Sequence, residues 1–540
     1  MVRRETDLES LKRGGEFDLL VVGGGATGCG VALDAASRGL RVALVEREDF
    51  ASGTSGRSTK LVHGGVRYLE AALTHLDRVQ FNLVREGLHE RGILLRLAPH
   101  LCHRLPLVTP LYGTLEVPYV WFGLKLYDLL AGRLGLGHSR FLRARELLRR
   151  FPMIRSQGLK GGVLYYDGQF NDARMNLALA LTARQQSALV LNYLEVQELL
   201  HREGRVAGAL VRDGIEGDSF EIRARCVVNA TGPWSDLVRR LDDPRQEPLL
   251  AVSSGSHLVL PASFAPAGAG ITIPRTEDGR VLFILPWLGG CLVGTTDNPA
   301  RLEPDPQASP GDIDYLVRHL KRYFNLEVAP SDITAAWCGL RPLVQDPAAH
   351  DTARLARDHV VNVSGTGLVS IAGGKWTTYR RMAQDAVDAA LRVAQLAPGK
   401  GCHSDRIPLW GADGFHDTLA DELAREFHLE PEQAAHLSRN YGGEAGRVLA
   451  CCRGALAERL VAHHPYLKGE VVYAVRHEMV RHGADFLLRR IPLGLLDQAA
   501  ALEAVPAVLD LMSRELSWSP SERAVEAQRL STVLHRPHTS

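Results

Sequence analysis

The feature that most constrains the fold is a glycine-rich turn between an apolar run and a segment of small residues near the N-terminus. Residues 17–22 are mostly apolar, as expected of a buried parallel strand, and Gly23-x-Gly25-x-x-Gly28 follows directly. A segment of helical character comes next, and residues 41–45 are typical of a second strand. This order predicts a βαβ unit in which the helix N-terminus faces phosphate groups, as in a dinucleotide site.

The end of the second predicted strand carries an acidic residue. Glu46 stands 18 positions after Gly28, where a carboxylate can accept hydrogen bonds from the ribose hydroxyls of adenosine. A carboxylate at this place repels a 2′-phosphate, so the sequence argues against NADP.

Two later segments favour FAD over NAD. The apolar run 226–229 ends in Ala230-Thr231-Gly232, a turn often found against the cofactor in flavoproteins with two dinucleotide-binding domains. A further strand over 367–372 leads into a Gly-Gly turn and a helix over about 378–394, whose positive end can lie under the flavin pyrimidine ring. Each segment alone also fits an ordinary strand–helix turn. Together with the first motif they predict FAD.

Composition excludes several classes of protein. The 540 residues include 63 basic and 62 acidic side chains, and a net charge of +1 argues against a nucleic-acid partner. The eight cysteines form no C-x-x-C pair, which argues against a disulfide framework and structural zinc, so we expect a reducing compartment and no metal site. The N-terminus lacks the pattern of a secretory signal, and no run of 18 apolar residues is present. Any membrane contact is therefore expected to be peripheral.

One segment has the composition of such a contact. Residues 117–136 combine aromatic and aliphatic side chains, Trp121 and Phe122 among them, with Lys125 and Arg133. Aromatic and basic residues together on a short helix suit the lipid headgroup zone. A helix that covers the core of the substrate domain remains the alternative.

The predicted fold class is α/β, namely a two-dinucleotide-binding-domain FAD fold with an antiparallel-sheet substrate domain and a C-terminal helical domain. We expect a discontinuous FAD domain over 16–105, 165–245 and 355–394, and a substrate domain over 106–164 and 246–354. Residues 395–540 have helical spacing and are expected to form a helical domain that offers a surface for a homodimer or a partner.

The most specific stretch is SGRSTKLVHGGVRYLE at residues 55–70, which closely resembles the FAD-dependent glycerol-3-phosphate dehydrogenases. The resemblance continues through motifs in the family's order and covers almost the whole chain. These further motifs are YYDGQFNDARMN at 165–176, GSH at 255–257, GTTD at 294–297, GLRPL at 339–343, RD at 357–358, GGKWTTYR at 373–380, RHEMV at 476–480 and DFLLRR at 485–490.

This resemblance implies a reaction and partners. The family oxidises sn-glycerol 3-phosphate to dihydroxyacetone phosphate with FAD as the hydride acceptor, and a membrane quinone receives the electrons. The protein is then expected in the cytoplasm, peripherally associated with the inner face of the cell membrane. Three alternatives stay open: an oxidase that gives electrons to oxygen, an amine or 2-hydroxy-acid oxidoreductase on the same fold, and an interaction protein with structural FAD.

The substrate chemistry assigns candidate residues within these motifs. A dianionic phosphate needs Arg, Lys or Tyr donors, and Arg67, Tyr68, Arg357 and Lys375 stand at matching motif positions. Oxidation also releases the proton of the C2 hydroxyl, for which His257 is the predicted base. Arg341 is predicted to stabilise the developing alkoxide, and these two roles can be exchanged.

The predicted cofactor contacts follow the nucleotide turn, the 55–70 motif and the two flavin-side turns. His63 is expected to pack beside the flavin, and Ser58, Thr59 and Lys60 to meet its pyrophosphate or ring. The full set is Gly23, Gly25, Gly28, Glu46, Ser58, Thr59, Lys60, His63, Gly64, Ala230, Thr231, Gly232, Gly374, Lys375, Trp376 and Thr377.

Overall fold

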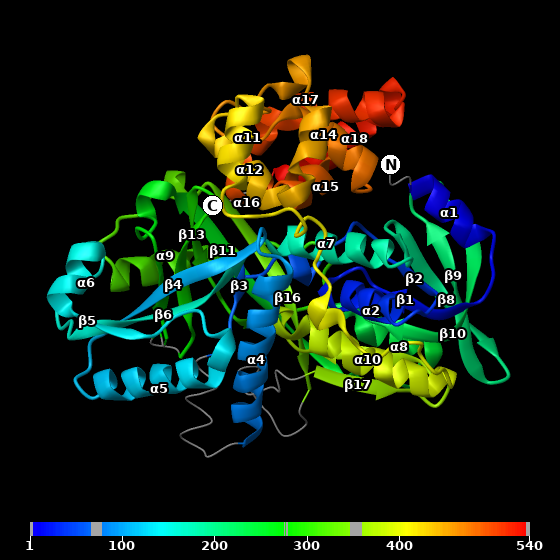
Figure 1. Cartoon of the computed structure of the whole chain (residues 1–540), viewed down its shortest axis with the longest axis horizontal. Helices are drawn as coiled ribbons and strands as arrows, with labels where there is room; N and C mark the ends of the chain where they lie inside the picture. Colours follow the sequence, from blue (N-terminus) through cyan, green and yellow to red (C-terminus); the bar gives the residue numbers. More distant parts are fainter. Residues whose placement is uncertain (1–3, 66–77, 275, 277–278, 346–358, 536–540) are drawn as a thin grey trace.

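The fold is built around two large sheets and a layer of C-terminal helices (Figure 1). The computed structural model describes residues 4–65, 78–274, 276, 279–345 and 359–535. In this part of the chain the mixed α/β architecture and the C-terminal helices agree with the predicted fold class.

The first sheet carries the glycine-rich turn at its centre. Its strands follow the order β17-β18-β10-β1-β2-β7, with β8 and β9 joined to β10 as an antiparallel extension. Neighbouring strands from β18 to β7 are parallel, and β17 is antiparallel at the edge. Their bounds are β1 (Phe17–Val22), β2 (Val42–Val45), β7 (Leu189–Leu191), β8 (Leu194–Arg202), β9 (Arg205–Asp213), β10 (Ser219–Asn229), β17 (His359–Val363) and β18 (Val369–Gly373).

Helices cover this sheet and bury its apolar strands. The small residues of α2 (Ala26–Ser37) pack between α7 (Asp172–Gln185) and α10 (Tyr379–Ala394), so the helix after the glycine turn is almost wholly buried. The N-terminal α1 (Arg4–Lys12) packs near β7 and β10, and α8 (Ser235–Asp242) follows β10.

The second sheet is mostly antiparallel. It follows the order β15-β11-β14-β13-β12-β4-β6-β3, with β16 paired to β11 and β5 to β6. The expected domain limits at residues 105 and 165 fall inside β4 and β6. The strand bounds are β3 (Leu61–Val62), β4 (Cys102–Leu111), β5 (Arg140–Arg143), β6 (Gly161–Phe170), β11 (Leu250–Pro261), β12 (Gly270–Ile273), β13 (Leu282–Trp287), β14 (Gly290–Gly294), β15 (Asn298–Pro299) and β16 (Ala335–Val344).

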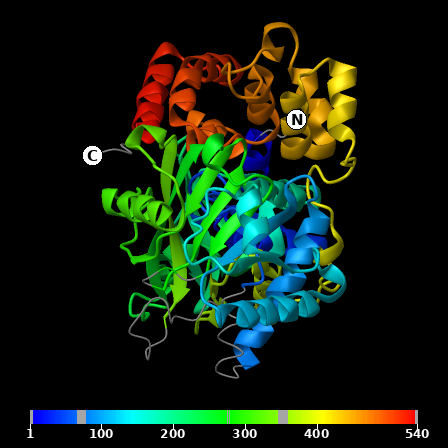
Figure 2. The same cartoon turned by 90° about the vertical axis from the view of Figure 1, so that its left-hand side faces the viewer.

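Helices lie around this sheet, both at the side of the molecule and at its end away from the C-terminal helices (Figures 1 and 2). They are α4 (Arg78–Leu97), α5 (Glu116–Ala131), α6 (Ala144–Arg150) and α9 (Pro310–Tyr323). None of the helices in the described ranges is long and apolar enough to cross a membrane.

The C-terminal helices pack on both sheets. They are α11 (Leu419–Phe427), α12 (Pro431–Tyr441), α13 (Ala445–Cys451), α14 (Lys468–His477), α15 (Gly483–Asp485), a π-helical turn (Phe486–Arg490), α16 (Leu493–Leu496), α17 (Gln498–Leu516) and α18 (Pro520–Leu534). Side chains of α14, α17 and α18 share one apolar core with strands of the second sheet.

Gly28→Ala tests the packing of the glycine turn. A Cβ at Gly28 would lie 1.8 Å from the carbonyl oxygen of Gly23, which is backbone and cannot move aside without displacing α2. We expect a fall of several degrees in the apparent Tm and purification with much less FAD, measured by thermal denaturation and by absorbance of the bound flavin.

Gly123→Ala is the matched control. Gly123 lies within α5, and its added Cβ would meet no atom within 4 Å. This change should leave Tm and FAD content equal to wild type or slightly higher, because alanine stabilises a helix interior. Equal behaviour of the two variants would show that the close approach at Gly28 has no importance.

Candidate active site

The glycine turn places the N-terminus of α2 at a cavity, which Gly25, Ala26 and Thr27 line. Gly23 has a φ of 109°, which favours glycine, and Gly28 packs against it. The Ser55 hydroxyl accepts the N–H of Ala26 at 2.9 Å, while one carboxylate oxygen of Glu46 accepts the N–H of Gly24 at 2.6 Å. The turn thus joins Glu46, the carboxylate predicted to bind the ribose, to the helix N-terminus that would face a pyrophosphate.

A cavity of about 740 Å³ runs along this turn, a size that suits a cofactor. Nine of the predicted cofactor residues line it, namely Gly23, Gly25, Glu46, Ala230, Thr231, Gly232, Gly374, Lys375 and Trp376. The walls also include Arg47, which lies over the ring of Trp234 at 5.5 Å, and the last residues of β18. The cavity therefore connects all three segments from which FAD was predicted, and the residues present fit this cofactor.

The Gly-Gly turn is fixed by its neighbours. Gly373 and Gly374 both have positive φ, and a Cβ at Gly374 would lie 2.4 Å from the sulfur of Met382 in α10. The indole N–H of Trp376 donates to the carbonyl of Ser55 at 2.9 Å. The turn below the predicted flavin position is thereby bonded to the loop that caps α2.

The 55–64 loop is held by one buried carboxylate. Asp172, at the start of α7, accepts the N–H of Ser58 at 3.0 Å, its hydroxyl at 2.7 Å and the Lys60 ammonium at 2.6 Å. Lys60 is buried at 1% exposure, also donates to the carbonyl of Gly56, and adopts a positive φ. The side chains of Ser58 and Lys60 therefore stabilise the loop itself.

Like Ser58 and Lys60, the other predicted cofactor residues lie outside the described lining of the cavity. His63 and Thr377 join the two motif loops, because the Thr377 hydroxyl and the His63 backbone N–H lie 3.3 Å apart. The N–H of Gly64 donates to the Tyr127 hydroxyl at 2.8 Å. Thr59 contacts His257, and Gly28 packs in the turn. Direct contact of these residues with FAD stays a prediction.

His257 lies on β11 of the second sheet, between β14 and β16, and its side chain is buried. It pairs across from Trp337 in β16 and from Gly294 in β14, and its ring stacks on Trp337 with centroids 5.3 Å apart. Its Nε2 lies 2.9 Å from the Thr59 hydroxyl, and Nδ1 has no hydrogen-bond partner in the described part of the chain. One ring nitrogen is therefore buried without a hydrogen-bond partner among the described residues, and His257 lies outside the described lining of the cavity.

The surroundings of His257 favour its neutral form. Burial lowers the pKa of His257 well below its ordinary value of 6.5, and the positive charges of Arg341 and Lys60 lower it further. A neutral imidazole can accept a proton, as the predicted base requires.

Arg341 is held by the GTTD motif. Its guanidinium donates to the Thr295 hydroxyl at 2.8 Å, to the carbonyl of Thr296 at 3.1 Å and to Asp297 at 3.2 Å. A Cβ at Gly255 would lie 2.1 Å from Nη2, so the glycine two residues before His257 makes room for this side chain. The structure thus brings Arg341 close to the strand that carries His257.

The predicted phosphate-binding residues are only partly described. Lys375 lines the cavity beside Trp376. Arg67, Tyr68 and Arg357 lie outside the described residues. The described part of the chain has no group of three or more His, Cys, Asp or Glu side chains that could hold a metal ion.

Sequence reasoning assigned no role to two residues at this site. Asp172 stands in the YYDGQFNDARMN motif, directly after Asn171, which caps α7. Its place in this motif was the sequence signal that could have identified it as a site residue. Trp337 has no local motif, and its importance depends on the pairing of β11 with β16.

Comparison with known proteins decides the family. Residues 18–380 match the family model described as FAD dependent oxidoreductase, and residues 402–523 match the C-terminal domain of alpha-glycerophosphate oxidase. The mitochondrial glycerol-3-phosphate dehydrogenase of Mus musculus is 45% identical over 98% of this chain and 75% of its own length. The chain belongs to the FAD-dependent glycerol-3-phosphate dehydrogenase family.

Other relatives agree with this assignment. The mitochondrial enzyme of Arabidopsis thaliana is 44% identical over 96% of this chain and 86% of its own length. The glycerol-3-phosphate dehydrogenase of Bacillus halodurans, solved with FAD, is 30% identical with a TM-score of 0.82, over 99% of this chain and 98% of its own. The predicted family, fold class, enzyme class and FAD cofactor are confirmed.

Thr59→Val tests the contact that orients His257. Valine keeps the shape of threonine but cannot hydrogen-bond to Nε2, and a buried polar atom that loses its partner costs about 1–3 kcal/mol. We expect flavin reduction by sn-glycerol 3-phosphate to slow about tenfold in stopped-flow absorbance measurements made at equal concentrations of bound FAD.

The matched control is Thr272→Val in β12. It removes the hydrogen bond between the Thr272 and Tyr165 hydroxyls, which is buried in the same sheet. Its reduction rate should equal that of wild type. A wild-type rate in Thr59→Val would mean that this hydroxyl does not orient the imidazole.

Proposed function

We propose that the protein oxidises sn-glycerol 3-phosphate to dihydroxyacetone phosphate at the site between the two sheets and passes the electrons to a membrane quinone. FAD supplies the hydride acceptor when it is bound. The observation that carries the site assignment is His257, a buried neutral imidazole beside Arg341 and the loop that caps the cofactor helix. Identity of 45% along nearly the whole chain to a relative named as a dehydrogenase supports a dehydrogenase over an oxidase.

His257 takes the proton of the C2 hydroxyl in this proposal. Its neutral form is favoured in the free protein by burial and by the nearby cations. A dianionic substrate brings negative charge to the same place, which favours the imidazolium and raises the pKa of His257 towards neutrality. The site therefore becomes more basic when the substrate binds.

Cationic side chains bind the substrate phosphate and the developing alkoxide. Lys375 lines the cavity, and Arg67, Tyr68 and Arg357 are its predicted partners at the phosphate. Arg341 is already oriented by Thr295 and Asp297, so it can stabilise negative charge on the substrate oxygen without first reorganising.

An anaerobic titration tests the proposed reaction. Adding sn-glycerol 3-phosphate to the purified holoprotein should bleach the flavin absorbance band, and glycerol should not, because it lacks the phosphate. A soluble quinone analogue should then reoxidise the flavin much faster than dissolved oxygen. Failure of the phosphate ester to bleach bound flavin would overturn the substrate, and faster reoxidation by oxygen would indicate an oxidase.

The pH dependence and His257→Asn test the base. A base is inactive when protonated, so the rate falls as pH drops through its pKa. The acid limb of kcat/KM, which reports the free protein, should lie below pH 6.5, and that of kcat should lie higher because bound substrate raises the pKa. His257→Asn should keep FAD, lose at least 100-fold in reduction rate and lack this limb. Full turnover in the variant would exclude His257 as the base.

Helix α5 is the proposed membrane contact. Leu124, Tyr127 and Ala131 are buried, whereas Phe122 and Leu129 are 62% and 74% exposed, so the helix presents a second apolar face to solvent. This helix lies at the end opposite the C-terminal helices (Figure 1). A bilayer surface, on the inner face of the cell membrane, would cover this face. A homodimer through the C-terminal helices stays a prediction.

A lipid-flotation assay tests α5. The double variant Trp121→Glu/Phe122→Glu should reduce binding to vesicles of phosphatidylcholine and phosphatidylglycerol at least tenfold, because buried carboxylates oppose insertion into the headgroup zone. Val525→Glu changes another apolar side chain, 69% exposed on α18, and should bind like wild type. Equal flotation of the two variants would remove α5 as the contact.

A further inference from the structure

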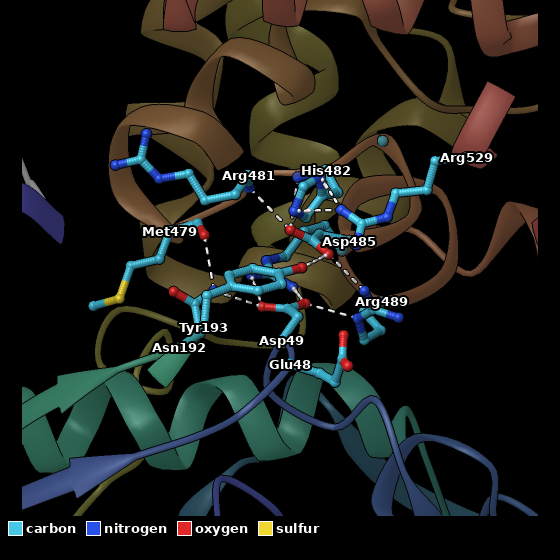
Figure 3. Close-up of polar contacts among 12 residues, drawn as sticks. Glu48, Asp49, Asn192, Tyr193, Met479, Arg481, His482, Asp485, Arg489 and Arg529 are labelled. Carbon is cyan, nitrogen blue, oxygen red and sulfur yellow. Dashed lines mark hydrogen bonds and ion pairs between the residues drawn. The ribbon is translucent and has the colours of Figure 1, made fainter. Parts of the chain in front are cut away.

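The cavity that fits FAD has a wall made by the C-terminal helical domain. Near Glu46 and Glu48 the lining passes from the first sheet to side chains after residue 480. Figure 3 shows several of these side chains above the strand ends of the first sheet. The C-terminal residues in the lining are His482, Ala484, Asp485, Leu488, Arg489, Arg529 and Val533.

The C-terminal wall is anchored to the segment that follows Glu46, the carboxylate predicted to bind the ribose. Asp49, fully buried three residues after Glu46, accepts Nε of Arg489 at 2.7 Å and the two terminal nitrogens of Arg490 at 2.7 and 3.0 Å. Burial opposes ionisation of Asp49, but Arg490 and Arg489 together lower its pKa to about 2. The three charges therefore stay paired at physiological pH.

The neighbouring wall of the cavity is tied to the same segment. The Asn192 amide donates to Asp49 at 3.0 Å and to the carbonyl of Met479 at 3.0 Å. The Tyr193 hydroxyl donates to Asp485 at 2.6 Å, and the Tyr193 backbone N–H donates to the carbonyl of Glu48 at 3.0 Å. Both strand ends that border the Glu46 part of the cavity are thus bonded to residues 479–490.

Arg489 both anchors the C-terminal wall to Asp49 and lines the cavity. It lies in the π-helical turn Phe486–Arg490, a geometry that often occurs at functional sites. It bonds to Asp49 through Nε and to Asp485 through Nη2 at 2.6 Å, and it lines the cavity. Arg529, on α18, is exposed, lies 2.9 Å from the His482 ring, and lines the cavity as well.

We propose that the C-terminal helical domain is a clasp over the AMP half of FAD, with Arg489 coupling its docking to the Glu46 loop and Arg529 adding positive charge at the edge. The inference rests on the predicted position of the adenosine ribose at Glu46. It assigns the helical domain a role in cofactor retention, separate from oxidation of the substrate.

Ligand binding to the apoprotein tests the clasp. FAD and ADP both carry the AMP group, whereas FMN carries only the flavin half. Arg489→Gln should weaken FAD and ADP binding about tenfold, leave FMN binding unchanged, and speed FAD release from the holoprotein about tenfold, followed by the rise in flavin fluorescence. Equal loss for FMN and ADP, or no loss for either, would overturn the proposal.

Two further variants make the result specific. Arg523→Gln changes an arginine of the same helix as Arg529 that pairs with Asp510 and lies outside the described lining, so it should release FAD like wild type. Arg529→Gln should release FAD about threefold faster. If Arg489→Gln does not fold, wild-type release from Arg529→Gln would overturn the clasp.

Glu46→Gln separates this proposal from the assumed position of the ribose. It should weaken ADP binding and leave FMN binding unchanged, because Glu46 lies at the ribose end of the cavity. If Glu46→Gln leaves ADP binding unchanged while Arg489→Gln weakens it, the Glu46 carboxylate does not bind the ribose, and only the role of Arg489 in holding the AMP group is retained. If Glu46→Gln weakens ADP binding and Arg489→Gln does not, the clasp is rejected and the predicted ribose position is retained.

Discussion

The first turns of α7 hold the nucleotide turn, the motif loop and the C-terminal helices together. Asp172 binds Ser58 and Lys60, Asn176 donates to the carbonyl of Gly24 at 2.8 Å, and Arg174 donates to both oxygens of Glu478 at 2.8 Å. These groups are buried, and an unpaired charge in such a place is strongly destabilising. The pairing therefore constrains three distant parts of the chain to one geometry, and the cavity lies among them.

The sequence predicts best what is local. The glycine turn, the Ala-Thr-Gly strand end and the Gly-Gly turn each need only a few consecutive residues, and all three line one cavity. Their physical requirements, a positive φ or a close backbone approach, are visible in the residue types themselves. The family motifs extend these predictions to the rest of the site. They identify the positions of site residues but not the residues that these contact.

Contacts between distant residues could not be read in the same way. Lys60 stands in the motif loop and was expected at the cofactor, but its ammonium bonds to Asp172, 112 positions later. Trp337 reaches His257 only because β16 pairs with β11 in one register. Arg489 and Arg490 were recognised as part of a motif, yet their partner Asp49 lies about 440 residues earlier. Such pairs are set by tertiary packing, which local patterns do not encode.

A second set of buried contacts involves α5, at the end of the molecule opposite the C-terminal helices. Tyr127 of α5 accepts the N–H of Gly64 and donates to Asp167 at 2.9 Å, and Asp167 also binds Arg91 of α4. Gly64 follows His63, which is bonded to Thr377 in the turn after β18. The buried face of α5 is therefore connected through a few residues to the predicted flavin position, whereas the proposed clasp holds the Glu46 end. The proposed clasp and the proposed membrane contact thus lie at opposite ends of the molecule, and the predicted flavin position is connected to both.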